Sequence, residues 1–84
     1  MVYEIRWTVI ASNQFGRLDK TIKKRIIDKL ESARENPFLH ETRLVGFDAY
    51  TIKVGDYRII TAIEKDTLVI LVLKVGHRKS IYKK

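Results

Sequence analysis

Three apolar runs rich in β-branched residues, joined by two short turns, constrain the fold of this chain more than any other feature. The runs cover residues 50–54, 57–64 and 67–75, and the first turn is the dipeptide Gly55-Asp56. Connections this short join antiparallel neighbours, because a parallel pair needs a crossover of about a dozen residues or more. The second half of the chain is therefore predicted to form a three-stranded antiparallel meander.

The first half predicts one strand and two helices. Residues 2–9 alternate between apolar and polar side chains, which is typical of a half-buried strand. Ser12 is the expected N-cap of a short helix through the segment NQFGRL, and Asp19 is the expected N-cap of a longer helix over residues 20–35. The second helix should end before Pro37, because the residue preceding a proline disfavours helical angles. An apolar stripe at helical spacing follows both helices and comprises Phe15, Leu18, Ile22, Ile26, Leu30 and Ala33.

The element order indicates an α+β fold. Residues 38–48 are expected to form a loop with a short extended piece near Leu44, so the order is N-terminal strand, helix, helix and meander. A two-helix hairpin that covers one face of a single sheet gives a two-layer domain. The chain has 84 residues and no linker or repeat, so residues 1–84 are expected to form one domain.

The chain is basic, with 17 Lys and Arg against 10 Asp and Glu and a net charge of +7. This charge favours nucleic acid first, an acidic protein second and an anionic membrane third, although it also serves solubility. There is no cysteine, and two histidines are too few for a convincing metal site, so we expect no metal and no cofactor. No run reaches the roughly 18 apolar residues of a membrane span, and the first residues lack the apolar core of a signal peptide. We therefore expect a cytoplasmic protein without a membrane partner.

The Gly-Asp turn sets the pairing of the first two strands of the meander. It places Lys53 directly opposite Arg58 on one face of the sheet, where two like charges repel each other. The pair is either a tolerated repulsion on a polar face or a site that binds an anion. The other face, which carries Ile52 and Ile59, is more continuously apolar and should meet the helices.

The last strand carries a basic tail back toward this pair. Counting across the second turn places Arg58 opposite Leu73, so the tail after Val75 emerges near the Gly-Asp turn. We therefore predict that Arg78 and Tyr82 lie close to the two cations of the hairpin.

Such a set suits the cleavage of RNA, whose 2′-hydroxyl is an internal nucleophile. Lys53 is a candidate general base, and Arg58 and Arg78 can hold the charged phosphate of the transition state. Tyr82 could donate or relay a proton, or stack on a base. His77 has the chemistry of an acid–base catalyst, and it is equally suited to a turn in which it bonds to backbone.

Three motifs resemble those of the RelE family of toxin–antitoxin toxins. They are a Leu-x-Gly segment at residues 44–46, the pattern Y-x-I-K-x-G-D-Y-R-I at residues 50–59, and V-x-x-V-G-H-R-x-x-I-Y at residues 72–82. Length and element order also agree, so the similarity covers essentially the whole chain. The combination of the last two motifs is fairly specific to the RelE/ParE superfamily.

The resemblance implies an endoribonuclease that enters the ribosomal A site and cuts mRNA without a metal. It also implies a RelB-like antitoxin that binds and silences the toxin in a hetero-oligomer, with the ribosome and mRNA as further partners. The implied catalytic residues are Lys53, Arg58, Arg78 and Tyr82, with His77 and Arg43 as auxiliary residues and with Lys79, Lys83 and Lys84 binding RNA.

The chain departs from the RelE pattern at two positions. Thr51 stands where some members have a second catalytic lysine, and Val45 stands where some have a basic residue, with Arg43 close by. Two other functions are open on the same fold, although the first belongs to a branch that generally lacks this cationic set. One is a ParE-like toxin that acts on DNA gyrase, and the other is a non-catalytic module that binds RNA or the ribosome.

Overall fold

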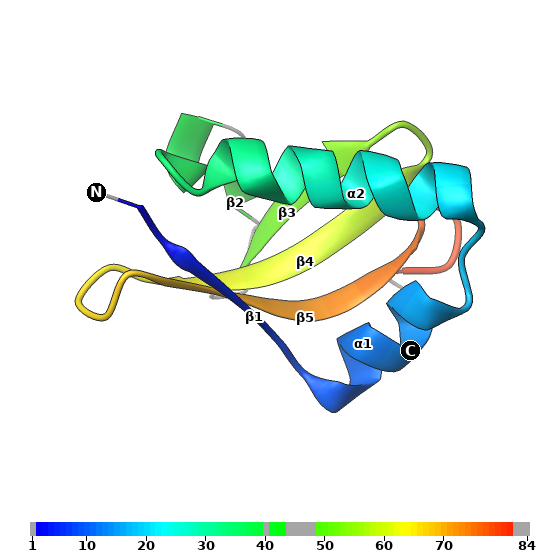
Figure 1. Cartoon of the computed structure of the whole chain (residues 1–84), viewed down its shortest axis with the longest axis horizontal. Coiled ribbons are helices and arrows are strands. Elements are labelled where there is room, and N and C mark those ends of the chain that lie inside the picture. Colours follow the sequence, from blue (N-terminus) through cyan, green and yellow to red (C-terminus); the bar gives the residue numbers. More distant parts are fainter. Residues whose placement is uncertain (1, 40, 44–48, 82–84) are drawn as a thin grey trace.

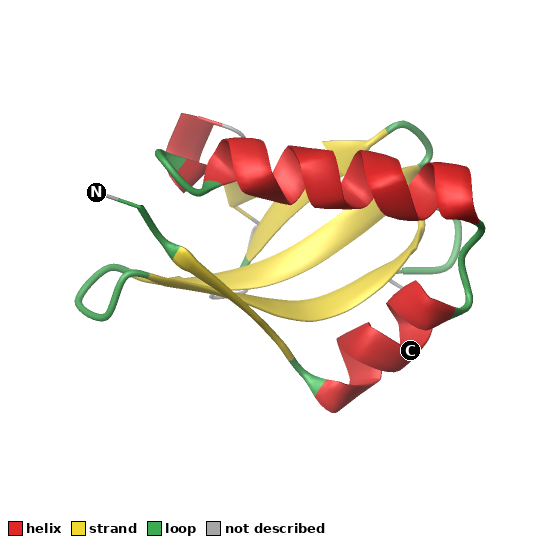
Figure 2. Ribbon diagram, in the orientation of Figure 1, coloured by secondary structure: helices red, strands yellow, loops and turns green. Residues whose placement is uncertain are grey.

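The computed structural model describes residues 2–39, 41–43 and 49–81, and it has the predicted α+β architecture (Figure 1, Figure 2). Within these residues five strands form one sheet in the order β1-β5-β4-β3-β2. Strand β1 pairs with β5 in parallel, and the other pairs are antiparallel. The elements are β1 Glu4–Trp7, α1 Val9–Gly16, α2 Lys20–Ala33, the 3-10 helix η1 Pro37–Leu39, β2 Glu41–Arg43, β3 Tyr50–Val54, β4 Tyr57–Glu64 and β5 Val69–His77.

The segment predicted as a loop contains more structure than expected. It begins with η1 and continues as β2, which pairs antiparallel with β3 and forms one edge of the described sheet. The extended piece therefore lies at residues 41–43, and the position near Leu44 falls outside the described residues. No helix in the described part of the chain is long and apolar enough to cross a bilayer.

The N-cap predicted for the first helix is wrong. Thr8, not Ser12, caps α1: its backbone is extended, with φ −73° and ψ 162°, and its hydroxyl oxygen accepts a hydrogen bond from the Ala11 N–H at 3.0 Å. The alternation of residues 2–9 does not reveal this, because Val9 fits the strand pattern although it is 77% exposed at the start of the helix. The predicted cap of α2 is confirmed, since Asp19 accepts from the Ile22 N–H at 3.0 Å.

We expect Thr8→Ala to lower the free energy of unfolding by about 1–2 kcal/mol, because it removes an N-cap. The matched control is Ser12→Ala, which changes an exposed position inside α1 and should stay within about 0.5 kcal/mol of the wild type. Urea denaturation of the two variants measures the difference. Equal losses would contradict the assignment of the cap.

One face of the sheet carries the main core. The predicted stripe of the two helices packs on the face that bears Ile52 and Ile59, as expected (Figure 1). Ile26 and Leu30 of α2 are almost fully buried against it. A smaller cluster on the other face joins Ala49, Ile60 and Ile81, with Leu73 packed beside it.

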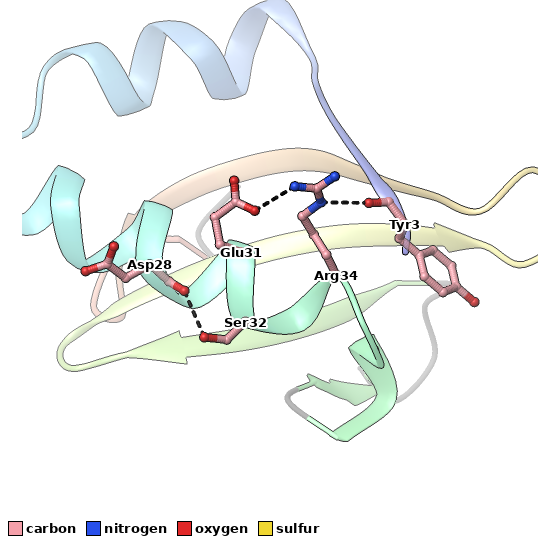
Figure 3. A network of polar contacts seen from close by, with 5 residues as sticks. All are labelled: Tyr3, Asp28, Glu31, Ser32 and Arg34. Atoms are coloured by element: carbon pink, nitrogen blue, oxygen red, sulfur yellow. Dashed lines mark hydrogen bonds and ion pairs between the residues drawn. The ribbon is translucent and has the colours of Figure 1, made fainter. Parts of the chain in front are cut away.

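The end of α2 is tied to the start of β1 (Figure 3). The Arg34 Nε donates to the Tyr3 carbonyl at 2.9 Å, and the Tyr3 N–H donates to the Arg34 carbonyl at 2.8 Å. A second guanidinium nitrogen of Arg34 pairs with the Glu31 carboxylate at 2.9 Å. The C-terminal end of α2 is thereby fixed to the segment that leads into β1.

The predicted pairing of Arg58 with Leu73 is wrong, and a bulge is part of the reason. Arg58 pairs instead with Gly76, because Glu64 pairs with Val69 across a longer turn and the register shifts again between Ile60 and Thr61. At this shift Thr61 pairs with Val72 and Ile60 with Lys74, so Leu73 is the extra residue of β5.

Helix α1 and its N-cap supply hydrogen-bond partners to the bulge residue Leu73 and to Val75, two residues farther along β5. The Thr8 hydroxyl donates to the Leu73 carbonyl at 3.2 Å, and the Gln14 side-chain oxygen accepts from the Val75 N–H at 2.9 Å. Both backbone groups would otherwise need another partner, because backbone polar groups in a protein interior are almost always paired. The segment from Thr8 to Gln14 thus holds the register that carries the last residues of β5 to the hairpin.

Gln14→Met keeps the side-chain length but removes the acceptor, so the Val75 N–H loses its partner. Val75 is buried, and we expect a loss of about 1–3 kcal/mol in the free energy of unfolding. Faster amide exchange at Val75, measured together with denaturation, would locate the effect. Asn13→Met is the control at an exposed neighbouring position, and an equal response of the two variants would contradict the role of Gln14.

Candidate functional site

The β3–β4 hairpin places two cations opposite each other. Lys53 pairs with Arg58 in register, as predicted, and the two residues around the turn are Gly55 and Asp56. Gly55 has φ +58°, in the left-handed region that glycine enters without strain. Like charges at directly opposed positions are destabilising, so this arrangement works against the stability of the sheet.

The guanidinium of Arg58 is held by backbone carbonyls. Its Nη1 donates to the Gly55 carbonyl at 2.8 Å and to the Tyr57 carbonyl at 2.9 Å. No carboxylate among the described residues forms an ion pair with it. Arg58 therefore presents a positioned positive charge at the end of the hairpin.

Arg78 lies in the turn after β5 and contacts Asp56 of the hairpin turn through both its backbone and its side chain. Its backbone N–H donates to the Asp56 carbonyl at 2.7 Å, and its Nε lies 3.5 Å from an Asp56 carboxylate oxygen. The two side chains are 54% and 68% exposed, so a ligand can approach both. The structure thus brings Arg78 to the hairpin of Lys53 and Arg58, as the topology predicts.

His77 has the geometry of a turn residue. Its Nδ1 accepts from the Lys79 N–H at 3.1 Å, and its carbonyl accepts from the N–H groups of Ser80 and Ile81 at 2.9 Å. It pairs with Tyr57, and their rings meet edge to face at 5.5 Å. Because opposed residues share a face, His77 lies with Tyr57 on the face of the sheet opposite to Arg58.

For the other predicted residues the structure gives a position in the fold or no description. Lys79 is exposed in the turn after β5, and Arg43 is the last residue of β2, opposite Tyr50. Thr51, at the position of the second lysine of some RelE toxins, is only 4% exposed. The predicted residues Tyr82, Lys83 and Lys84 lie outside the described residues.

Comparison with known families identifies the chain. A family described as the ParE toxin of the type II toxin–antitoxin system parDE matches residues 5–82, which is nearly the whole sequence. The chain belongs to the ParE toxin family. The resemblance to the RelE/ParE superfamily is thereby confirmed, and the protein is a toxin of a type II toxin–antitoxin system.

This ParE-family toxin is similar to a RelE-like protein and to chains of solved RelB-RelE and RelBE complexes. An Escherichia coli protein named as RelE-like toxin is 29% identical over 82 residues, covering 94% of this chain and 86% of the relative. The toxin–antitoxin complex RelB-RelE of Methanococcus jannaschii contains a chain with a TM-score of 0.74 and 28% identity, covering 92% of this chain and 94% of the other. A RelBE complex of Mycobacterium tuberculosis shares the fold, with a TM-score of 0.83 at 20% identity, over 93% and 100% of the two chains.

The sequence reasoning missed a second group of cations in this ParE-family toxin. An open groove of about 370 Å³ lies between α2 and the hairpin, and Arg25 and Lys29 of α2 line it together with Lys53. The spacing of four residues from Arg25 to Lys29 predicts a shared helix face. That these two residues meet Lys53 depends on how α2 packs on the sheet, which no local pattern indicates.

Proposed function

We propose that this toxin is a ribosome-dependent endoribonuclease, an mRNA interferase that cuts messages in the ribosomal A site and stops translation. The observation that carries the proposal is the meeting of Lys53, Arg58 and Arg78 at one end of the sheet. These cations come from β3, β4 and the turn after β5. The sequence similarity to a RelE-like toxin supports the same function.

The proposed reaction is an internal attack within the RNA. The 2′-hydroxyl oxygen forms a bond to the adjacent phosphorus, and the bond from phosphorus to the departing 5′-oxygen breaks, which leaves a 2′,3′-cyclic phosphate. One group takes the proton of the 2′-hydroxyl, and another gives a proton to the 5′-oxygen. We assign proton transfer to Lys53 and Tyr82 as a pair, and stabilisation of the phosphate charge to Arg58 and Arg78.

The ribosome has a defined part in this proposal. A side-chain set this small supplies charge and proton transfer, but few groups that align the 2′-hydroxyl with the departing oxygen. Correct alignment contributes a large share of the rate of such reactions. We therefore propose that the A site holds the message in the reactive geometry and that RNA away from the ribosome is a poor substrate.

We also propose a RelB-like antitoxin as the partner that silences the toxin. The similar chains from Methanococcus jannaschii and Mycobacterium tuberculosis occur in RelB-RelE and RelBE complexes. An acidic antitoxin segment would neutralise Arg58 and Arg78, whose charges lie at an accessible end of the sheet. Toxin and antitoxin would meet in the cytoplasm, where the ribosomes are.

A second candidate function is inhibition of DNA gyrase. The family whose description matches this chain is that of ParE toxins, and this observation favours it. The cations at the hairpin argue for the nuclease, since the transition state of RNA cleavage needs them. A non-catalytic module that binds RNA or the ribosome would use the same charges without cutting.

Ribosomes programmed with a defined message separate these functions. The purified toxin should produce new 5′ ends within the A-site codon, mapped by primer extension, and should leave the supercoiling activity of gyrase unchanged. Intact messages together with inhibited gyrase would establish the second candidate instead. Intact messages with stable ribosome binding would indicate the non-catalytic module.

A further inference from the structure

The groove between α2 and the β3–β4 hairpin carries a net positive charge. Among the described residues, Arg25, Lys29 and Asp28 of α2 line it and Lys53 lines its hairpin side, so the helix side carries two positive charges and one negative charge. Asp28 also pairs with Lys24 at 3.0 Å. Its negative charge is thus shared with a cation outside the groove.

The guanidinium of Arg25 packs against the hairpin turn at Gly55. Its two terminal guanidinium nitrogens lie 2.9 and 3.1 Å from the point that a Cβ on Gly55 would occupy. The missing side chain of Gly55 therefore allows the guanidinium to approach the turn. Within the described residues no carboxylate pairs with Arg25, so its charge is available to a ligand.

Lys53 connects the groove to the proposed catalytic end of the sheet. It lines the groove, and it is also the partner of Arg58 across the hairpin. An RNA strand that passes the turn would therefore contact Arg25 and Lys29 on the α2 side of Lys53. On the other side of Lys53 it would contact Arg58 and Arg78.

We propose that the groove is a second phosphate-binding subsite for an RNA strand, adjacent to the phosphate that is cleaved. This inference rests on the proposed nuclease function. Arginine binds phosphate oxygens in a bidentate manner, and lysine acts as a movable charge beside it. Arg25 would make the first kind of contact, and Lys29 the second.

The acceptors in the groove favour RNA over an acidic peptide. The Asp28 carboxylate can accept a hydrogen bond from a ribose 2′-hydroxyl, and the Ser32 hydroxyl, which donates to the Asp28 carbonyl at 3.0 Å (Figure 3), keeps its capacity to accept. The carboxylates of an acidic peptide cannot donate a hydrogen bond to Asp28, whereas each phosphodiester of RNA is joined to a sugar hydroxyl that can. The chemistry of the groove therefore fits a phosphodiester with its neighbouring sugar.

The test is the double variant Arg25→Gln/Lys29→Gln. Its probe is a single-stranded RNA oligonucleotide with free 2′-hydroxyls, kept away from the ribosome so that cleavage is slow, and binding is measured over a range of salt concentrations. We expect about tenfold weaker binding and a log–log salt slope smaller by about one to two, because two phosphate contacts are lost. The matched control is Arg17→Gln/Lys20→Gln, which removes the same charges from exposed positions outside the groove.

Vacant ribosomes form a second arm that distinguishes two sources of the phosphate. Weaker oligonucleotide binding supports a subsite for the message, whereas weaker binding to vacant ribosomes alone would assign the groove to ribosomal RNA and overturn a subsite beside the cleaved phosphate. Binding unchanged in both arms, or weakened equally by the control variant, would overturn the inference. It would also be overturned if only the affinity for an acidic antitoxin peptide fell.

Failure of this inference can be told apart from failure of the proposed function. If wild-type toxin does not cut messages on programmed ribosomes, the nuclease proposal fails whatever the groove binds. If cutting is present and depends on Arg78, while Arg25→Gln/Lys29→Gln binds both RNAs as the wild type does, only the second subsite is lost. Thermal unfolding of the double variant should match the wild type, since Arg25 is exposed and Lys29 only half-buried.

Discussion

Replacement of Arg78 by alanine is expected to slow message cleavage on the ribosome by about 10²- to 10³-fold and to abolish growth arrest, because a preorganised positive charge at the phosphate is lost. The fold should remain intact. The hydrogen bond from residue 78 to the Asp56 carbonyl uses the backbone N–H, which alanine retains. The ion pair with Asp56 is exposed and contributes at most about 1 kcal/mol.

Arg6→Ala is a matched control for this experiment. Arg6 is also exposed and pairs with an exposed carboxylate, that of Glu4, at 3.3 Å, but it lies on β1. It should cleave messages at the wild-type rate. Antitoxin binding by the Arg78→Ala protein should stay measurable, which shows that the protein is folded. Undiminished toxicity of Arg78→Ala would remove this residue from the mechanism.

Lys53→Ala is expected to lower the cleavage activity without lowering the free energy of unfolding. Loss of the proposed proton-transfer group should lower the cleavage rate by about 10²- to 10⁴-fold. Loss of the repulsion opposite Arg58 should leave the free energy of unfolding unchanged or raise it by about 0.2–1 kcal/mol. A more stable but inactive variant is the result expected of a charge kept for function.

Single-turnover cleavage on programmed ribosomes and urea denaturation measure these two quantities. Lys65→Ala is the control for the cleavage measurement, because Lys65 lies in the turn at the opposite end of β4 from Arg58. A destabilised Lys53→Ala protein, with activity lost only in proportion to its unfolded fraction, would show that Lys53 has a structural role. Full activity would show that another group transfers the proton.

Local patterns predict the hairpin and the helix stripe because short-range geometry decides both. A two-residue turn leaves one pairing for its strands, so Lys53 is correctly placed opposite Arg58 from the sequence alone. The spacing of Ile26 and Leu30 likewise gives the buried face of α2, since helix geometry fixes which side chains share a face.

The features that the sequence did not predict depend on contacts between distant residues. The Leu73 carbonyl at the bulge and the nearby Val75 N–H are paired by Thr8 and Gln14, which lie some sixty residues earlier in the chain. The contact of Arg25 with Gly55 depends in the same way on the position of α2 over the sheet. Neither the sequence around Leu73 nor that around Arg25 contains a signal for these arrangements.

The parallel pairing of β1 with β5 bears on how the toxin is synthesised. The sheet is completed only when residues 69–77 have left the ribosome that makes them, because β5 lies between β1 and β4. Contacts this distant in sequence form late, since a long loop must close before they are gained. Earlier during elongation the nascent chain lacks Arg78 and the strand that positions it. Under the proposed function, the ribosome that produces the toxin is thus spared until translation has passed the final strand.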